Sequence, residues 1–363
     1  MAKQCKTAED ATPQATNPSI VEAQPGNTRG GEQDPSRGVP LTSDTVDLFR
    51  NIYKNIEKEF IAFTDYVYID DRQKGVYSLR IAELILRTAA EIESLCKDLY
   101  ATLGCDGGGG RFHYDDPCIK EFISRWDIDK KIVEITHPFV RFSSRVLIPF
   151  RDADKKTQGN PNANEWKKSY NDIKHNFRNN MGSANIGAFL EELAALYLLN
   201  IYAAMLVKRD SGFDRDAASR VDCSFGSSLF AVKVGTILDA KSIGADGVII
   251  SDGEYRPEVL CYAMPTDKSL KRIYDIMSTA EAEARTSDVL TEALRELCQT
   301  GELKMPAVGE SLGAEAREKL MFKSRVKALN KCANQFGRAV EGMKYEMRLN
   351  SKELHREMTT KVQ

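Results

Sequence analysis

The chain has 363 residues with 51 basic and 53 acidic side chains, so its net charge is −2. This balance excludes a broad positive field that would hold duplex nucleic acid, and any RNA or DNA site must be a local patch. An apolar fraction of 42% supports a packed core, and the length fits two domains or one large domain with tails.

The cysteines are widely scattered, with no C-x-x-C pair and no histidine at the spacing of a zinc ligand. They are Cys5, Cys96, Cys105, Cys118, Cys223, Cys261, Cys298 and Cys332. The helical positions among them predict buried thiols, and we expect a reducing, cytoplasmic location with no metal and no cofactor.

Residues 1–42 are rich in Ala, Thr, Pro, Gln and Gly and carry few large apolar side chains. Such a segment cannot bury enough surface to offset its ordering entropy, so a disordered tail is predicted. The segment lacks a basic stretch followed by an apolar one, and we expect no signal peptide.

Helical periodicity begins at Asp44, and the strongest helix is predicted from Ser78 to Leu103. Its polar side carries Glu91, Glu93 and Lys97, with Glu93 and Lys97 at the i,i+4 spacing of an ion pair. The glycine run at 107–110 follows this helix instead of opening one, which indicates a linker and not a phosphate-binding loop.

A further helix is predicted over Pro117–Trp126, and two Val- and Ile-rich runs at 131–136 and 145–150 are typical of strands. A polar loop then leads to a helix that begins near Trp166, for which Asn162 or Asn164 is a plausible N-cap.

The helix at 166–178 has two contrasting faces when wound at about 100° per residue. Its apolar stripe holds Trp166, Tyr170, Ile173 and Phe177. Its opposite side holds Lys168, Asn171, His175 and Arg178. Core histidines usually lie on an apolar face, whereas His175 lies with a carboxamide and two cations.

An apolar helix is predicted over residues 186–207. Its run from Ala194 to Val207 is too short to span a bilayer and contains Asn200, so we expect a core helix and no membrane contact. The charged segment 208–220 marks a domain boundary. Beyond it, strand-like runs at 229–238, 248–251 and 258–264 and a helix at 268–297 predict an α+β region over 209–312.

The C-terminal segment 313–363 is predicted to be one long helix, because apolar residues recur with alternating spacings of four and three. These residues are Phe322, Val326, Leu329, Ala333, Phe336, Val340, Met343 and Met347. Two interpretations stay open: the helix packs on its own domain, or it forms a coiled coil with a second chain or partner protein.

The run Glu165–Asn176, with its Y-N-x-x-K-H pattern, resembles a helix of HEPN-like bacterial proteins found among abortive-infection, phage-defence and toxin genes. Matching segments extend the resemblance over about 45–207: Tyr77–Arg80, Ala89–Lys97, Leu147–Phe150 and Ile186–Tyr202. It implies a HEPN-like helical bundle at 43–208 that forms a homodimer. The expected fold is therefore mainly α with a small β component.

Active members of this family resemble metal-independent ribonucleases with an R-x4–6-H motif. Before His175, the three positions that an arginine could occupy are Tyr170, Ser169 and Lys168. The sequence therefore leaves two functions open. One is an endoribonuclease that acts in defence or as a toxin, and the other is a non-catalytic dimerisation or sensor module that binds RNA or a partner protein.

The residues on this helix suggest roles for a ribonuclease. His175 would be the general acid or base, Asn171 a positioning donor, and Lys168 or Arg178 the group that stabilises charge on the phosphate. Three further residues would contact single-stranded RNA, namely Lys167, Lys174 and Tyr170. Glu91, Glu93 and Lys97 on the earlier helix are predicted to support the site.

Overall fold

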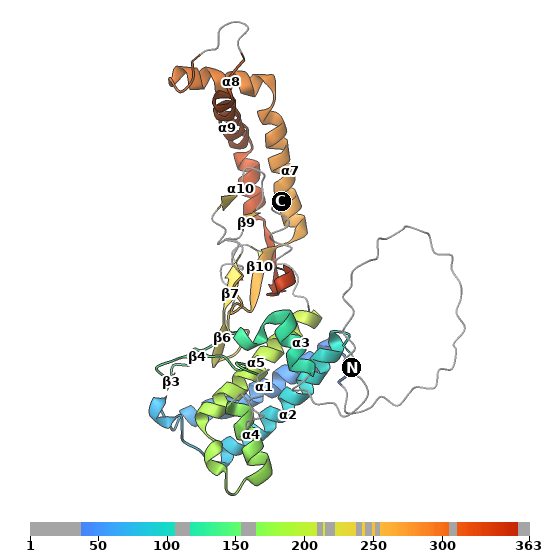
Figure 1. The fold of residues 1–363 in the computed structure, drawn as a ribbon, viewed down its shortest axis with the longest axis vertical. Coiled ribbons are helices and arrows are strands. Elements are labelled where there is room, and N and C mark those ends of the chain that lie inside the picture. The colour runs from blue at the N-terminus through green and yellow to red at the C-terminus, as the bar shows by residue number, and fades with distance from the viewer. Residues whose placement is uncertain are drawn as a thin grey trace, which may run out of the picture.

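The computed structural model describes residues 38–105, 117–153, 165–208, 213–214, 222–236, 242–243, 249–250, 255–304 and 311–354. It is mainly helical with small β-sheets, as expected for the fold class. A helical body lies at one end, a long helical arm at the other, and β-strands between them (Figure 1).

Five helices form the body, and the predicted helices of this region are confirmed. They are α1 (Ser43–Thr64), α2 (Leu79–Thr102), α3 (Pro117–Trp126), α4 (Glu165–Asn176) and α5 (Ile186–Lys208). Helix α5 is central, because α1, α2 and α4 all pack against it. Its side chains are buried almost all round from Ile186 to Ala203, which an amphipathic surface helix would not allow.

By length and composition, helix α5 is apolar enough to cross a membrane. However, 72% of its most apolar 18-residue stretch is buried inside the structure. This burial agrees with the prediction of a core helix.

The start of the ordered body lies earlier than predicted. Residues 38–42, assigned to the disordered tail, lie against α2: the Val39 amide donates to Asp98 Oδ1 at 2.9 Å and the Leu41 amide to Thr102 Oγ1 at 2.8 Å. Gly38 is needed for this approach, because a Cβ there would lie 2.1 Å from the Lys97 carbonyl carbon. The rest of the predicted tail lies outside the described residues.

Two small sheets belong to the body. Strand β1 (Ile69–Asp70) pairs parallel with β3 (Val140–Arg141). A three-stranded antiparallel sheet has the order β4 (Val146–Leu147), β2 (Val133–Ile135) and β6 (Phe230–Val232).

Strand β6 lies beyond the domain boundary predicted at 208, yet it pairs with β2 of the body. Leu229 and Phe230 belong to the same core as the helices, and Glu57 of α1 accepts hydrogen bonds from the backbone amides of Ser228 and Leu229 at 3.1 Å. The body therefore includes residues 222–232, which composition alone assigned to the next region.

A third, four-stranded sheet connects the body to the arm. Its order is β5 (Phe213–Asp214), β11 (Lys344–Leu349), β10 (Cys261–Pro265) and β7 (Val234–Thr236). Strand β10 runs antiparallel to β11 and parallel to β7. A separate pair joins β8 (Ser242–Ile243) to β9 (Ile249–Ile250).

The arm consists of α7 (Asp267–Ala284), α8 (Ser287–Gln299), α9 (Ala314–Lys331) and α10 (Ala333–Glu341). Helix α7 packs along α9 and α10, and α8 lies across the far end of the arm (Figure 1). The helix predicted over 268–297 is thus divided in two by a turn at Arg285 and Thr286.

The prediction of one long helix over 313–363 is wrong. Helix α9 ends at Lys331, α10 ends at Glu341, and residues 344–349 form strand β11. The apolar seam of α9 also points outward, with Phe322 69% exposed and Val326 and Leu329 exposed as well. Instead α9 buries the small residues Ser324 and Ala328, and Ala328 packs with Ala280 and Ala284 of α7.

Several predicted features lie outside the described residues. They are the N-cap at Asn162 or Asn164, the glycine run at 107–110, Cys5, and the chain beyond residue 354.

Candidate functional site

Helix α4 is fixed to the body by its apolar stripe. Trp166 is 2% exposed, and its indole Nε1 donates a 2.8 Å hydrogen bond to the carbonyl oxygen of Pro149. Phe150 meets the Trp166 ring edge-on with 6.4 Å between centroids, and Ile173, two turns on, is 1% exposed. These contacts set the rotation of the helix and so decide which residues face outward.

The opposite face of α4 is open to solvent. Lys168, His175 and Arg178 are exposed, and Asn171 is half-buried. Because α4 ends at Asn176, Arg178 lies in the following turn, where the Asn180 amide donates to the Asn176 carbonyl at 3.0 Å. The predicted division of the helix into a core face and a polar face is confirmed.

The charged groups of this face have no acidic partner in the described part of the chain. Lys168, His175 and Arg178 take part in no ion pair there, whereas several lysines and arginines of the arm pair with glutamates. The positive charges of Lys168 and Arg178 are therefore left to attract an anionic partner.

Tyr170 serves mainly as a packing residue. It is half-buried against the core, and the Lys174 ammonium lies 5.2 Å from the centroid of its ring. This cation–π contact keeps Lys174 close to α4. Lys167 is half-buried at the start of the same helix. Substrate contacts by these three residues stay a prediction.

The supporting residues of α2 are not joined to His175. Glu93 Oε1 pairs with Lys97 Nζ at 2.7 Å, as the i,i+4 spacing predicted. Partial burial raises the pKa of Glu91, an effect that the charge of Arg87 opposes. Among the described residues, no hydrogen bond or ion pair links His175 to Glu91, Glu93 or Lys97.

One copy of the chain thus presents a single imidazole, a carboxamide and two cations on one helical face. An imidazole can transfer a proton near neutral pH, and cations can bind phosphate oxygens. The described residues contain no group of three or more His, Cys, Asp or Glu side chains that could hold a metal ion.

No protein-family model, curated protein or solved structure matches this chain significantly. The HEPN-like resemblance of the α4 segment therefore stays a prediction.

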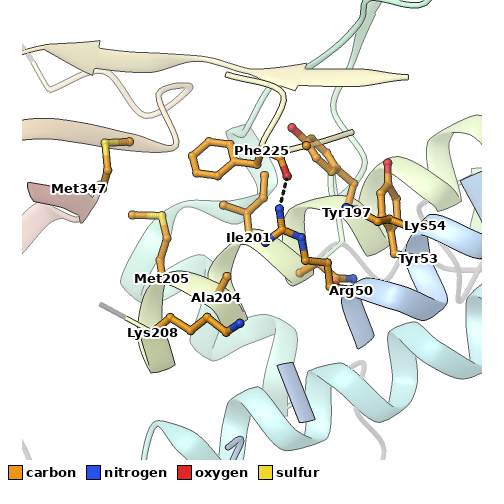
Figure 2. Close-up of a pocket in the computed structure, with 12 residues that line it drawn as sticks. Arg50, Tyr53, Lys54, Tyr197, Ile201, Ala204, Met205, Lys208, Phe225 and Met347 are labelled. Atoms are coloured by element: carbon orange, nitrogen blue, oxygen red, sulfur yellow. Dashed lines mark hydrogen bonds between the residues drawn. The ribbon is translucent and has the colours of Figure 1, made fainter. Parts of the chain in front are cut away.

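The structure also contains a cavity of about 320 Å³ that sequence reasoning missed. It lies between α1, α5, the turn at 222–227 and β11, and none of its lining residues belongs to α4 (Figure 2). Two features of the sequence could have indicated part of its lining. Arg50 and Lys54 are like charges at i,i+4 on α1, an unfavourable spacing unless an anion is near, and Asn200 is a polar residue in an apolar helix.

Proposed function

We propose that this chain is a cytoplasmic HEPN-like protein that binds RNA through the polar face of α4 and cleaves it as a homodimer. The observation that carries the proposal is that Lys168, His175 and Arg178 are all exposed and unpaired among the described residues. A cation without an acidic partner can bind a phosphate oxygen without first breaking an ion pair.

The reaction would be attack by the ribose 2′-OH on the adjacent phosphorus. The new P–O2′ bond forms as the P–O5′ bond breaks, which gives a 2′,3′-cyclic phosphate and a 5′-hydroxyl. One base takes the 2′-OH proton and one acid protonates the leaving 5′-oxygen. Lys168 and Arg178 would stabilise the charge on the phosphate, and Asn171 would donate a hydrogen bond to it.

A homodimer, which the HEPN-like resemblance implies, would meet this proton balance. A single copy has one imidazole on the face, and the reaction needs both a proton acceptor and a proton donor. Two α4 faces that meet around one phosphate would supply two His175 rings, one in each role.

A second function, RNA binding without cleavage, is favoured by a specific observation. Tyr170 occupies a position where the ribonuclease motif has arginine, and its ring is packed against the core beneath Lys174. Lysine at 168 supplies charge but lacks the bidentate fork of arginine. In this form the chain would be a dimerisation or sensor module of a defence or toxin system.

The purified full chain should be incubated with single-stranded RNA without added metal, alongside the His175→Ala and Lys168→Glu variants. We expect cleavage by the wild type, its loss in His175→Ala with binding retained, and weakened binding in Lys168→Glu. Lys58→Glu, at an exposed lysine on α1 outside both candidate sites, is the matched control and should bind and cleave as the wild type does.

The outcomes separate the two functions. RNA binding without cleavage by the wild type supports the non-catalytic form. Equal cleavage by the wild type and His175→Ala overturns the catalytic form. Equal binding by the wild type and Lys168→Glu removes α4 as the RNA-binding face and overturns both.

A further inference from the structure

We infer that the cavity between α1, α5, the 222–227 turn and β11 binds a small anionic molecule with a flat ring, of the nucleoside monophosphate class. Its volume of about 320 Å³ lies at the lower end of the range for ligand pockets. The inference uses none of the residues of the α4 face, so either can fail without the other.

A pair of cations faces the 222–227 turn at the edge of the cavity. Arg50 Nη2 donates a 3.1 Å hydrogen bond to the carbonyl oxygen of Phe225 (Figure 2). A Cβ on Gly226 would lie 3.0 Å from Arg50 Nη2 and 4.0 Å from Lys54 Nζ, so both cationic groups lie beside this glycine.

Neither charge of this pair is neutralised within the described part of the chain. Arg50 and Lys54 form no ion pair there, whereas Lys208, also at the cavity, pairs with Asp47 of α1. An arginine fork beside a lysine suits a phosphate group, which accepts charge-assisted hydrogen bonds from both.

Asn200 of α5 lines the cavity and carries a buried amide oxygen without a hydrogen-bond partner among the described residues. It is 8% exposed, and its Nδ2 donates to the carbonyl oxygen of Leu196 at 2.9 Å. That bond fixes which way the amide points. Its Oδ1 is buried and accepts no hydrogen bond from any described residue. A buried acceptor without a donor is costly, so a ligand with an N–H or O–H group would be favoured here.

The walls of the cavity are apolar and aromatic. Tyr53 and Tyr197 lie with 5.7 Å between ring centroids, and both hydroxyls already have partners in the protein. Their rings therefore act as surfaces. The remaining apolar lining consists of Ile201, Ala204, Met205, Phe225 and Met347 (Figure 2).

Together these features select the ligand class. A nucleotide supplies a flat base with an N–H donor for Asn200, and its phosphate supplies the negative charge for Arg50 and Lys54. A fatty acid anion would suit the cations and the apolar wall but has no donor for Asn200.

Binding of AMP, GMP, CMP and UMP to the full chain should be measured by calorimetry, with adenosine, inorganic phosphate and decanoate as comparisons. We expect at least one nucleotide to bind with a dissociation constant well below about 1 mM. It should bind at least about tenfold more tightly than adenosine or phosphate, because each lacks one half of the contacts.

Lys54→Glu should weaken nucleotide binding by about tenfold or more, since an attraction becomes a repulsion. Lys58→Glu is the matched control, one turn along α1 and equally exposed, and should bind as the wild type does. Asn200→Leu should also weaken binding. Gly226→Ala adds a Cβ against Arg50 at a φ of +78° and should close the cavity edge.

Three results would overturn the inference. The first is absence of binding by every nucleotide at about 1 mM. The second is binding that Lys54→Glu leaves unchanged or that Lys168→Glu on α4 abolishes. The third is binding of decanoate in preference to all four nucleotides.

Discussion

The ammonium group of Lys131 donates a 2.7 Å hydrogen bond to the carbonyl oxygen of Pro257, far along the chain. A second bond of 2.8 Å goes to the carbonyl oxygen of Val259, and the Lys131 side chain is completely buried. This lysine joins the helical body to the segment that leads into β10.

Burial lowers the pKa of Lys131 to about 8, although the nearby carboxylate of Asp127 acts in the opposite direction. In the unfolded chain the ordinary value near 10.5 applies, so the unfolded state binds more protons between these two values. The free energy of unfolding should therefore rise with pH from about 8 to 10.5, by at most roughly 3 kcal/mol from this residue.

Urea unfolding of the wild type and Lys131→Met at several pH values isolates this effect from other titrating groups. The stability of the wild type relative to Lys131→Met should increase across this range and then level off. A difference that is constant or falls with rising pH would contradict the assignment.

Glu192 of α5 is fully buried, and neither of its carboxylate oxygens has a hydrogen-bond partner among the described residues. Burial raises the pKa of Glu192 well above its usual value, so the folded state holds a proton that the unfolded state releases first. Stability from this residue is therefore lost as pH rises above about 4.5.

We expect Glu192→Gln to raise the melting temperature at pH 8 and to change it little at pH 4. Calorimetric melting at both pH values provides the check. A variant less stable than the wild type at pH 8 would show that the buried carboxyl is stabilising.

The carboxylate of Glu57 holds the 222–230 segment against α1. Its Oε1 accepts hydrogen bonds from the Tyr53 hydroxyl at 2.8 Å, from the Ser227 hydroxyl, and from the amides of Ser228 and Leu229. Glu57→Ala would remove the acceptor that these donors share and leave the Tyr53 hydroxyl and the Leu229 amide only Ser227 Oγ, so it should reduce the free energy of unfolding by about 3 kcal/mol.

Glu57→Gln keeps an oxygen in place without the charge, so we expect a smaller loss. Chemical denaturation of both variants tests this order. If both variants lose the same free energy of unfolding, the charge of Glu57 and not the position of its oxygen would be responsible for the stabilisation.

The rotation of α9 can be tested with neighbouring residues. Leu329 is exposed, so Leu329→Glu should change the free energy of unfolding by no more than about 0.5 kcal/mol. Ala328 is completely buried among alanines of α7, so Ala328→Leu should destabilise by about 2 kcal/mol through overpacking. If Leu329→Glu destabilised the protein more than Ala328→Leu, Leu329 would be the buried residue, as the predicted heptad seam requires.

If the α4 face binds single-stranded RNA, its affinity must depend on salt. The logarithm of the binding constant should fall linearly with the logarithm of salt concentration, with a slope of about −0.7 for each phosphate neutralised. Lys168→Ala should reduce the steepness of that slope by about 0.7, whereas Lys58→Ala should leave it unchanged. Fluorescence anisotropy over a salt series measures both.

Helices α1 to α4 could be predicted because each has one apolar stripe that decides its burial, and α5 because it is apolar almost all round. Trp166 and Ile173 are buried and His175 is exposed, as the helical wheel of α4 required. The same approach failed at 344–349, where Tyr345, Met347 and Leu349 alternate as in a strand. Met343 and Met347 also fit a heptad, and strand pairing with β10 decided between the two periods.

The cavity could not be predicted because its residues come from four separate segments. Arg50, Asn200, Phe225 and Met347 share no local spacing, and only tertiary packing brings them together. The α4 face was predictable for the opposite reason, since one helix carries all of it.

Strands β10 and β11 are direct antiparallel neighbours, and Pro265 pairs with Tyr345 at the edge nearest the arm. Everything from α7 to α10 is therefore an insertion at the tip of a β-hairpin, and both ends of that insertion emerge side by side. A tight Asn-Gly turn could replace residues 267–343 without changing the strand register. Tyr345 of β11 packs with Ile273 and Ala339 at the base of this insertion, so moving the arm to another hairpin would require carrying Tyr345 along with it.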